Sequence, residues 1–542
     1  MNYPEKLNTL KPSERIEYFL EMCNYPEKVQ EKILTDILQL NSDCEFGRKY
    51  KFADIKSIDD YRQNVPITHW EEYDASSVRM QNGEKNILFS GDTEYFINTS
   101  GTTGKEKILP ESYQGKLVKD LTSSLRNNML IAKYPSLLKG KFLPLSNSPI
   151  VGHTPCGIPF GSASGLTTEN TPSELAKLNA CPQIVKQIPD QQSADYAIMR
   201  FAMQHDVRII TGNNAGRIPA LLQTAEDNFE RICTDIEKGT LDIDLKRYPE
   251  IPEEKILELL TPLPDRAEEL RANFRNTGKV TLYVYWPNLE VIRCWLSGSV
   301  GGYIDMVKPY LNPNTVFIDA GYGASEGKFN IPMKPGNPSG ALSLFAGFYE
   351  FIPAENESIK PEILCAHELE TGKDYRLILT TYSGLYRYDM KDIIRVDGFT
   401  GKTPNIRFVS KTADVGNICG EKMSAEILRK ACKHIAGKME MQITHICAIP
   451  DKEKRCYIIC IESNTKLDTG NFADKLDRYL QQISRPYETF RGQNLINSVE
   501  VLQMRDGWQR TLYEEKLKPG ISISQIKLPF IYREIPGRRF II

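Results

Sequence analysis

The sequence predicts an α/β protein with a large amino-terminal domain and a small carboxyl-terminal α+β cap domain. Strand-like runs alternate with helical ones from about residue 70 to about residue 400, which is typical of an α/β domain. The residue pattern changes near position 408, and the remainder has its own helices and hairpin. A chain of 542 residues is long enough for more than one hydrophobic core. We therefore expect an amino-terminal domain at 1–408, a hinge at 409–412 and a mobile cap at 413–542.

Within the larger domain, the first seventy residues are predicted to be helical because apolar residues recur every three or four positions. Further along, β-rich runs bounded by turn residues predict strands that build packed sheets. The segments 344–351 and 375–381 are expected to be consecutive strands of a distorted barrel. The other expected elements are helices at 13–20, 32–38 and 218–222 and strands at 207–212, 280–285 and 315–319.

The smaller domain has the pattern of a compact α+β fold. Residues 426–431 and 472–483 have helical periodicity. Between them, the apolar runs 443–448 and 455–462 flank the turn residues 450–453, which predicts a β-hairpin.

The composition argues against several classes of binding partner. The formal net charge is -2 with no basic stripe, which argues against binding to nucleic acid or to an anionic membrane. The sequence has no apolar run suited to a signal sequence or a membrane span. Its twelve cysteines are scattered, without Cys-x-x-Cys or His-x-x-x-His spacing, which disfavours a structural zinc site. We expect reduced, buried thiols in a cytoplasmic protein.

The most informative stretch is the loop at 98–110, which packs hydroxyls, glycines and two lysines directly after a strand-like run. Small residues let the backbone approach a polyphosphate, hydroxyls and amides donate hydrogen bonds, and Lys105 and Lys107 supply positive charge. The loop differs from the P-loop, because Thr99 stands where the first glycine should be and Glu106 follows Lys105. It is therefore a candidate phosphate cradle of another design, the alternative being an ordinary turn.

Three further clusters carry residues that suit a nucleotide site. In 321–327 a tyrosine lies between glycines, where its ring could lie on a base, and Glu326 could hold magnesium. In 384–395, Asp392 lies where a carboxylate could accept both ribose hydroxyls. In 524–529, Lys527 precedes a proline-stiffened segment that suits a fixed cation. Taken singly, each cluster could equally be a surface turn, a mixed-charge hairpin or a surface lysine.

Together and in this order, the four clusters resemble the adenylate-forming superfamily of acyl-activating enzymes. The resemblance is greatest for the auxin-responsive acyl acid–amido synthetase family, which is best known in plants and also found in bacteria. It runs from about residue 10 to the end, and three further stretches favour this family within the superfamily. The motifs are 99–110, 322–326, 386–392 and 524–529, and the additional stretches are 286–289, 348–353 and 520–529.

The resemblance implies ATP and Mg²⁺ as cofactors and assigns a role to each motif. Tyr322 would stack on adenine, Glu326 would hold magnesium, and Asp392 would bind the ribose. Lys527, delivered by the small domain, would be the catalytic lysine between the substrate carboxylate and the α-phosphate. The cofactor-binding positions are Ser100, Gly101, Thr102, Thr103, Gly104, Lys107, Tyr322, Gly323, Ala324, Ser325, Glu326, Asp392 and Lys411. The acyl-binding positions are Arg126, Gly157, Ile158 and Ser162.

The sequence departs from the family pattern at three places. Lys391 stands where the family usually has glycine, and Lys411 stands where related enzymes tend to carry arginine at the domain junction. Lys105 and Lys107 bracket Glu106, and Lys107 aligns better with the phosphate-binding lysine. None of these departures removes a group that the chemistry needs.

The implied reaction has two steps. A carboxylic acid attacks the α-phosphorus of ATP and releases pyrophosphate, and an amine, expected to be that of an amino acid, then displaces AMP to form an amide. The small-molecule acid and amine are thus the expected partners, and the small domain is expected to swing between the steps. One alternative is an acyl-CoA ligase that passes the acyl group to CoA. A more distant one is an inactive sensor that binds a nucleotide or acyl ligand.

Overall fold

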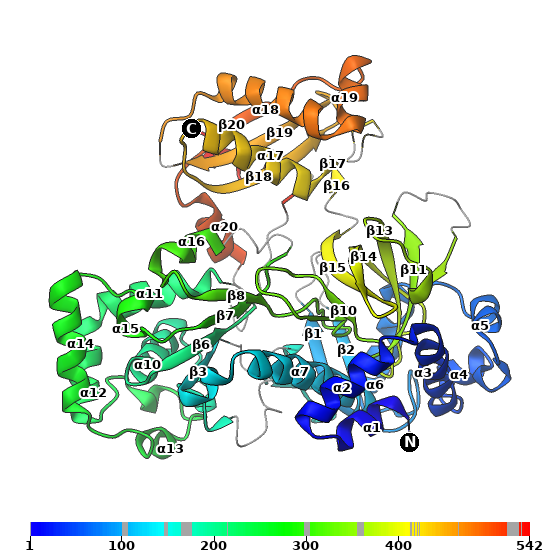
Figure 1. Ribbon diagram of the computed structural model, residues 1–542, viewed down its shortest axis with the longest axis horizontal. Helices are drawn as coiled ribbons and strands as arrows, with labels where there is room; N and C mark the ends of the chain where they lie inside the picture. Colours follow the sequence, from blue (N-terminus) through cyan, green and yellow to red (C-terminus); the bar gives the residue numbers. More distant parts are fainter. Residues whose placement is uncertain are drawn as a thin grey trace. The chain divides into compact units, whose positions relative to one another are not determined.

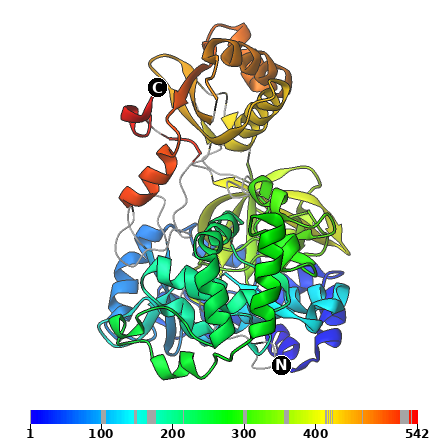
Figure 2. The ribbon, with the colours of Figure 1, turned by 90° about the vertical axis from the view of Figure 1, so that its left-hand side faces the viewer.

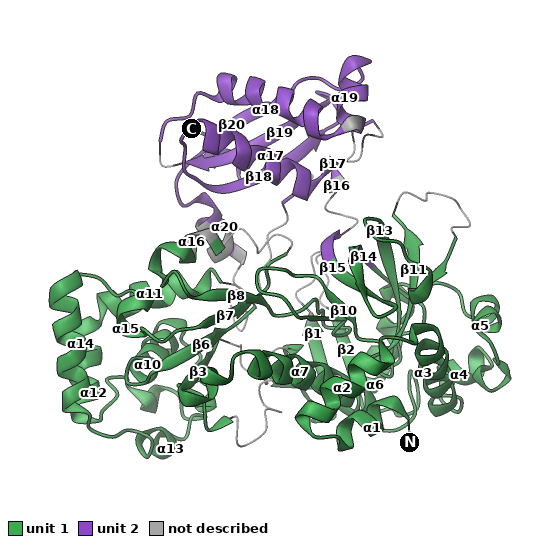
Figure 3. Cartoon of the chain, viewed as in Figure 1, with its two compact units in different colours: residues 1–101, 105–390, 395–407 green, residues 102–104, 391–394, 408–542 purple. Residues whose placement is uncertain are grey.

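The computed structural model divides the chain into two compact units, which are described separately (Figure 3). Unit 1 consists of residues 1–101, 105–390 and 395–407, and unit 2 of residues 102–104, 391–394 and 408–542. Within these limits the structure describes residues 2–99, 107–145, 150–163, 176–213, 215–297, 304–354, 362–411, 415–416, 418–419, 421, 423–463, 465–516, 530–532 and 534–542. The hinge residue 412 lies outside the described part, so hinge motion at 409–412 stays a prediction.

Unit 1 begins with the helices expected from the sequence (Figure 1). Helices α2 and α3 start at Pro12 and Pro26, where a missing N–H costs nothing because the first turn has no acceptor for it. Helix α3 buries Val29, Ile33 and Ile37, a spacing of four that defines one apolar face. The helices of this region are α1 (Tyr3–Thr9), α2 (Pro12–Met22), α3 (Pro26–Leu40), α4 (Glu45–Lys49), α5 (Ile58–Asn64), α6 (Asp74–Gln81) and α7 (Tyr113–Lys133).

A four-stranded sheet carries the segments on both sides of the predicted phosphate loop. Its order is β2-β1-β5-β4, with β1 antiparallel to β2 and parallel to β5. Thr99 at the end of β1 pairs with Lys107 at the start of β2, and Tyr95 pairs with Glu111. The strands are β1 (Thr93–Thr99), β2 (Lys107–Ser112), β4 (Gly152–His153) and β5 (Pro159–Gly161).

A second four-stranded sheet, β3-β6-β7-β8, is entirely parallel. Alternate residues face two different cores: Ile210 and Ile292 pack into the core formed with helices α10 to α14, while Ile209 and Val291 pack with Leu130 of α7. Figure 2 views unit 1 from the side on which the cyan-to-green helices lie. The strands are β3 (Lys141–Pro144), β6 (Val207–Thr211), β7 (Val291–Cys294) and β8 (Val316–Asp319).

The helices that accompany this parallel sheet include one segment that we expected to be a strand. The β-rich run 280–285 predicted a strand, but the structure has the short helix α15 there, with Leu282 and Tyr285 buried. Residue propensity was outweighed by packing, since both side chains join the large apolar core next to α14. The helices are α10 (Gln191–Met203), α11 (Arg217–Asp227), α12 (Phe229–Lys238), α13 (Glu253–Leu257), α14 (Pro264–Thr277), α15 (Leu282–Tyr285) and α16 (Ile304–Val307).

The strands expected to form a distorted barrel instead build a seven-stranded sheet, in the order β12-β11-β13-β14-β15-β10-β9. Among the described strands, β12 and β9 are its two edges and no pairing joins them, so the barrel is not closed. Alternation predicts strands but carries no information on closure, which depends on stagger and tilt. The strands are β9 (Asn330–Pro332), β10 (Gly340–Leu342), β11 (Phe348–Pro353), β12 (Leu364–Cys365), β13 (Asp374–Thr380), β14 (Tyr388–Thr400) and β15 (Thr403–Lys411).

Unit 2 contains the α+β arrangement predicted for the cap, and its expected hairpin is confirmed as β18–β19. The third strand, β20, pairs parallel to β19. Tyr457, Ile459 and Ile461 of β19 face the core with α17 and α18, whereas the alternate residues face Trp508 and Phe540. The elements are β16 (Val415–Gly416), β17 (Met423–Ser424), α17 (Ala425–Lys438), β18 (Ile443–Asp451), β19 (Cys456–Ser463), α18 (Thr469–Ile483), α19 (Arg485–Gly492), β20 (Glu500–Met504) and α20 (Trp508–Lys516).

All twelve cysteines are free, and ten of them are buried. In the part of the chain that the structure describes, none of the helices combines the length and the apolar character that crossing a membrane requires.

Candidate active site

The loop that carries Glu326 starts where strand β8 ends. The buried Asp319 carboxylate accepts a hydrogen bond from the Gly321 N–H at 2.7 Å and another from the Leu296 N–H at 2.7 Å. Burial raises the pKa of Asp319 to about 6, although both N–H donors and the nearby Arg126 and Arg293 oppose this shift. The carboxylate therefore fixes the path of the chain as it leaves the parallel sheet, at the edge where α/β proteins collect ligands.

Gly321 allows this turn for two reasons. Its φ is +90°, which side-chain-bearing residues rarely adopt, and a Cβ atom there would lie 2.3 Å from Cζ of Arg126. Gly321→Ala is expected to destabilise unit 1 by about 1–3 kcal/mol, as measured by urea denaturation. The control is Gly323→Ala, where the nearest atom would be 3.5 Å away. Equal stability of the two variants would contradict this account of Gly321.

Arg126, predicted to contact the acyl substrate, is buried against the backbone of the same loop. It donates from Nε and Nη2 to the carbonyl oxygen of Asn330, at 2.9 and 2.6 Å, and from Nη2 to that of Tyr322 at 3.1 Å. Burial, reinforced by Arg293, lowers its pKa to about 9. These contacts make Arg126 a support of the loop, and a direct contact with substrate stays a prediction.

The ring of Tyr322 packs against Phe329, with ring centroids 4.7 Å apart. Its backbone N–H donates to Oδ1 of Asn330 at 2.7 Å, and the residue is buried. This arrangement places the side chain inside unit 1, and its stacking on adenine stays a prediction.

Glu326 lies at the tip of a tight hairpin. Gly323 and Lys328 form an antiparallel bridge, and Ala324 and Gly327 exchange backbone hydrogen bonds of 2.8 and 3.3 Å. Ser325 and Glu326 are thus the two central residues, and both line a small pocket in unit 1. Its other lining residues are Trp70, Leu88, Leu109, Pro110, Glu111, Lys119, Thr381, Ser383 and Leu385.

The Glu326 carboxylate is half-buried and, in the part of the chain that is described, forms no hydrogen bond or ion pair. An oxygen donor without a protein partner in a pocket suits a hard cation such as Mg²⁺. The described residues contain no group of three His, Cys, Asp or Glu side chains able to hold a metal by themselves. A single carboxylate with phosphate oxygens completing the coordination is a common way to bind Mg²⁺, so the donor set fits.

Lys107 projects from the start of β2 on the same face as Leu109 and Glu111, which line this pocket. Its ammonium donates to the Tyr388 hydroxyl at 3.0 Å and lies 5.8 Å from the ring centroid of Trp70. The predicted phosphate-binding lysine and the predicted magnesium carboxylate thus belong to the same region of unit 1.

Asp392 and Lys411 are paired in unit 2. The Lys411 ammonium lies 2.9 Å from Oδ1 of the buried Asp392, while the lysine side chain is 41% exposed. Lys391, which replaces the family's usual glycine, has a φ of +54°, so the backbone keeps the left-handed conformation that glycine adopts easily. The sequence predicted both site residues but not their ion pair.

The predicted acyl-binding segment forms the hairpin between β4 and β5. Thr154 and Ile158 are joined by backbone and side-chain hydrogen bonds, and Gly157 has a φ of +87° at its tip. Ser162 is buried just after β5. The acyl-binding roles of Gly157, Ile158 and Ser162 stay predictions. Ser100, Gly101, Thr102, Thr103, Gly104 and Lys527 lie outside the described residues.

Sequence reasoning missed the charged residues that support these motifs. Glu350, 1% exposed, lies between Arg62 and Arg387, each 2.9 Å away. Glu111, equally buried, pairs with Lys119 of α7. The signals were present but weak: Arg387 lies inside the third motif, and Glu111 follows Lys107 by four residues on one strand.

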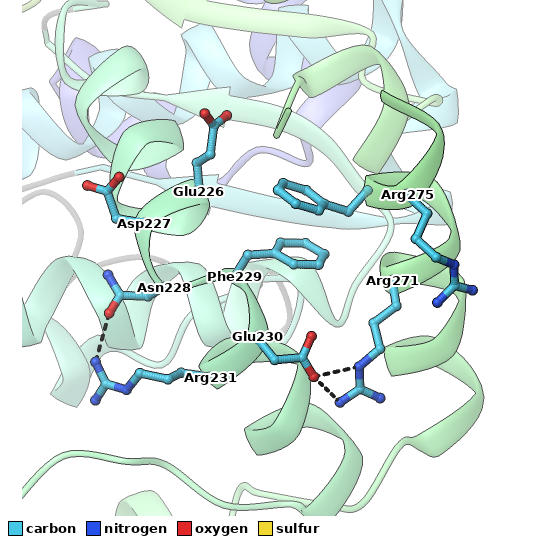
Figure 4. Close-up of a pocket in the computed structure, with 9 residues that line it drawn as sticks. Glu226, Asp227, Asn228, Phe229, Glu230, Arg231, Arg271 and Arg275 are labelled. Carbon is cyan, nitrogen blue, oxygen red and sulfur yellow. Dashed lines mark hydrogen bonds and ion pairs between the residues drawn. The ribbon is translucent and has the colours of Figure 1, made fainter. Parts of the chain in front are cut away.

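A second pocket lies between helices α12 and α14 (Figure 4). Phe229 and Phe274 stack there with centroids 4.1 Å apart, and Arg271 pairs with Glu230 at 2.8 Å. The residues that line it, all in the described part of unit 1, include none of those predicted for the active site.

Comparison with known families gives a match over most of the chain. The GH3 family N-terminal domain matches residues 15–316, the GH3 family central domain residues 341–411, and the GH3 family C-terminal domain residues 425–535.

Individual relatives are distant in sequence but similar in length. The indole-3-acetic acid-amido synthetase GH3.3 of Arabidopsis thaliana is 23% identical, over 96% of this chain and 91% of the relative. The 4-substituted benzoates-glutamate ligase GH3.12 of the same plant is 24% identical, over 94% and 93%. Among solved structures, the GH3.15 acyl acid amido synthetase matches with a TM-score of 0.80 at 20% identity, covering 98% of this chain and 97% of that one. A 2-hydroxyisobutyryl-CoA ligase has a TM-score of 0.52 at 12% identity, covering 99% and 96%.

Proposed function

Because this chain belongs to the GH3 family, we propose that it is an ATP-dependent acyl acid–amido synthetase that joins a small-molecule carboxylic acid to an amine. The amine is expected to be that of an amino acid. The main structural support for this proposal is the Glu326 carboxylate, which lines a pocket of unit 1 without a partner among the described residues.

In the first step, an oxygen of the substrate carboxylate forms a bond to the α-phosphorus of ATP, and the bond from that phosphorus to pyrophosphate breaks. The residues at 100–104 and Lys107 would hold the phosphates, and Lys527 would neutralise charge between the carboxylate and the α-phosphate. Glu326 would hold the Mg²⁺ ion, which neutralises phosphate charge when bound. Tyr322 would bind adenine, and Asp392 would bind the ribose, near Lys411.

In the second step, the amine nitrogen attacks the acyl carbon, the bond to the AMP oxygen breaks, and the nitrogen loses a proton. The two-step route replaces oxide, a poor leaving group, with AMP. The swing of residues 413–542 about 409–412 is proposed to alternate between the two steps. Two crystal structures, one with ATP and one with AMP, that had the same angle between these segments would contradict the swing.

An amine acceptor is favoured over CoA by the three matching GH3 domains, because the CoA ligase shares only the fold with this chain. We also propose the cytoplasm as the compartment, since twelve free cysteines suit a reducing environment.

The deciding experiment measures pyrophosphate release over a panel of carboxylic acids, repeated with each amino acid and with CoA. Release is expected with a subset of acids, and mass spectrometry should detect an amide whose mass is that of acid plus amine minus water. A thioester formed only with CoA would show a CoA ligase instead. No turnover with any acid would favour the sensor.

A further inference from the structure

Helix α7 contacts the Glu326 hairpin at three positions on one face. Lys119, Ser123 and Arg126 are separated by four and then three residues, a spacing that places side chains on the same side of a helix. Lys119 donates to the carbonyl oxygen of Ser325 at 2.9 Å. Ser123 contacts the ammonium of Lys328, and Arg126 donates to the carbonyl oxygen of Tyr322 at 3.1 Å. The helix therefore holds both arms of the hairpin and its tip.

The contact at the tip differs from the other two because the hairpin's own hydrogen bonds end at Ala324 and Gly327. Ser325 and Glu326 lie beyond them, and the carbonyl of Ser325 belongs to the peptide that leads directly into Glu326. A donor that fixes this carbonyl fixes the orientation of that peptide plane, and with it the direction in which the Glu326 side chain leaves the backbone.

Lys119 is itself held in place. Its ammonium pairs with Glu111, and the two side chains are 12% and 1% exposed. The other oxygen of Glu111 accepts a hydrogen bond from the Ser383 hydroxyl at 2.9 Å. Glu111 projects from β2 on the same face as Lys107, so one strand carries both the predicted phosphate-binding lysine and the anchor of Lys119.

We propose that Lys119, oriented by Glu111, is a positioning residue that presents the Glu326 carboxylate to the magnesium ion of Mg·ATP. The proposal rests on the proposed function. Residues that orient a metal ligand typically change metal affinity or activity about 10–100-fold when they are replaced. Lys119 is expected to act on the metal-dependent part of nucleotide binding and not on the nucleotide itself.

The test uses the full chain and a non-hydrolysable ATP analogue, whose Kd is measured calorimetrically in Mg²⁺ and again in EDTA. The Kd in EDTA divided by the Kd in Mg²⁺ reports how much the metal strengthens binding. In the double variant Lys119→Met/Glu111→Gln, which leaves no buried charge without its partner, this ratio is expected to fall about 10–100-fold while the Kd in EDTA is unchanged. Lys133→Met, an exposed position on the same helix, should keep the wild-type ratio.

Thermal unfolding of each variant shows whether it is folded. If the double variant unfolds, Lys119→Gln takes its place, because glutamine is too short to reach both Glu111 and Ser325, and the same fall is expected. An unchanged ratio in a folded variant would overturn the positioning role. A weaker Kd in EDTA would also overturn it, because Lys119 would then bind nucleotide directly. A wild-type chain that binds no analogue would overturn the proposed function and this inference with it, whereas the other two outcomes leave the proposed function intact.

Discussion

Replacing Glu326 with glutamine is expected to slow adenylation at least about a hundredfold and to leave stability unchanged. The carboxylate lines the pocket without a partner among the residues that the structure describes, so its charge is not expected to contribute to the stability of the fold. Its proposed role is to hold the magnesium ion that neutralises phosphate charge. Interactions of that kind stabilise a transition state by several kcal/mol.

The measurement for Glu326→Gln is the rate of acid-dependent pyrophosphate release as a function of Mg²⁺ concentration. The variant should need more Mg²⁺ for half-maximal rate, and its thermal unfolding should match that of the wild type. Glu250→Gln, at an exposed position, is the matched control. A variant with wild-type rate and Mg²⁺ dependence would remove Glu326 from the metal site.

Replacing Glu350 with glutamine, in contrast to Glu326→Gln, is expected to cause a large loss of stability. Glu350 accepts hydrogen bonds from Nε of Arg62 and from Nε of Arg387, each at 2.9 Å, and is 1% exposed. The Arg387 side chain is only 4% exposed, and its Nη1 also donates to the carbonyl oxygen of Val65 at 2.7 Å. Loss of the carboxylate charge would leave the guanidinium buried without a counter-charge, which costs about 3–5 kcal/mol.

Urea denaturation followed by tryptophan fluorescence measures this loss for Glu350→Gln. Glu370→Gln is the control, because the Glu370–Lys373 pair is exposed on both sides and its removal should change the midpoint little. If the two variants unfolded at the same urea concentration, the buried cluster would not be the anchor of the third motif.

The sequence predicted the fold class and the order of the motifs well, because both depend on local patterns. The amphipathic spacing in 32–38 and the apolar runs around 450–453 are readable without knowledge of the partners they pack against. The run 280–285 was misread because its β-branched and aromatic residues suit a strand equally well, and only the core around Tyr285 decides for a helix. The sequence could not show that the sheet of the distorted barrel stays open, because closure is a property of the whole sheet.

For the candidate site, the motif residues could be identified from the sequence, but their supports could not. Glu111 reaches Lys119 across a strand-to-helix connection, and Lys119 reaches Ser325 across 206 positions. A charged side chain has no sequence signature that separates a buried contact of this length from a solvated surface position. The structure shows which side chains turn inward, and this is where it adds most to the sequence.

In the ion pair between Lys411 and Asp392, the lysine ammonium occupies an oxygen of the carboxylate that is proposed to bind the ribose, so it competes with the nucleotide. A nucleotide whose ribose hydroxyls bound both oxygens of Asp392 would have to displace the ammonium that lies 2.9 Å from Oδ1, so part of its binding free energy would go into releasing the lysine. Because the lysine is 41% exposed, dissolved salt screens this attraction and should make the displacement easier. Moderate ionic strength is therefore expected to weaken AMP binding less than it would at a pocket whose carboxylate stood vacant.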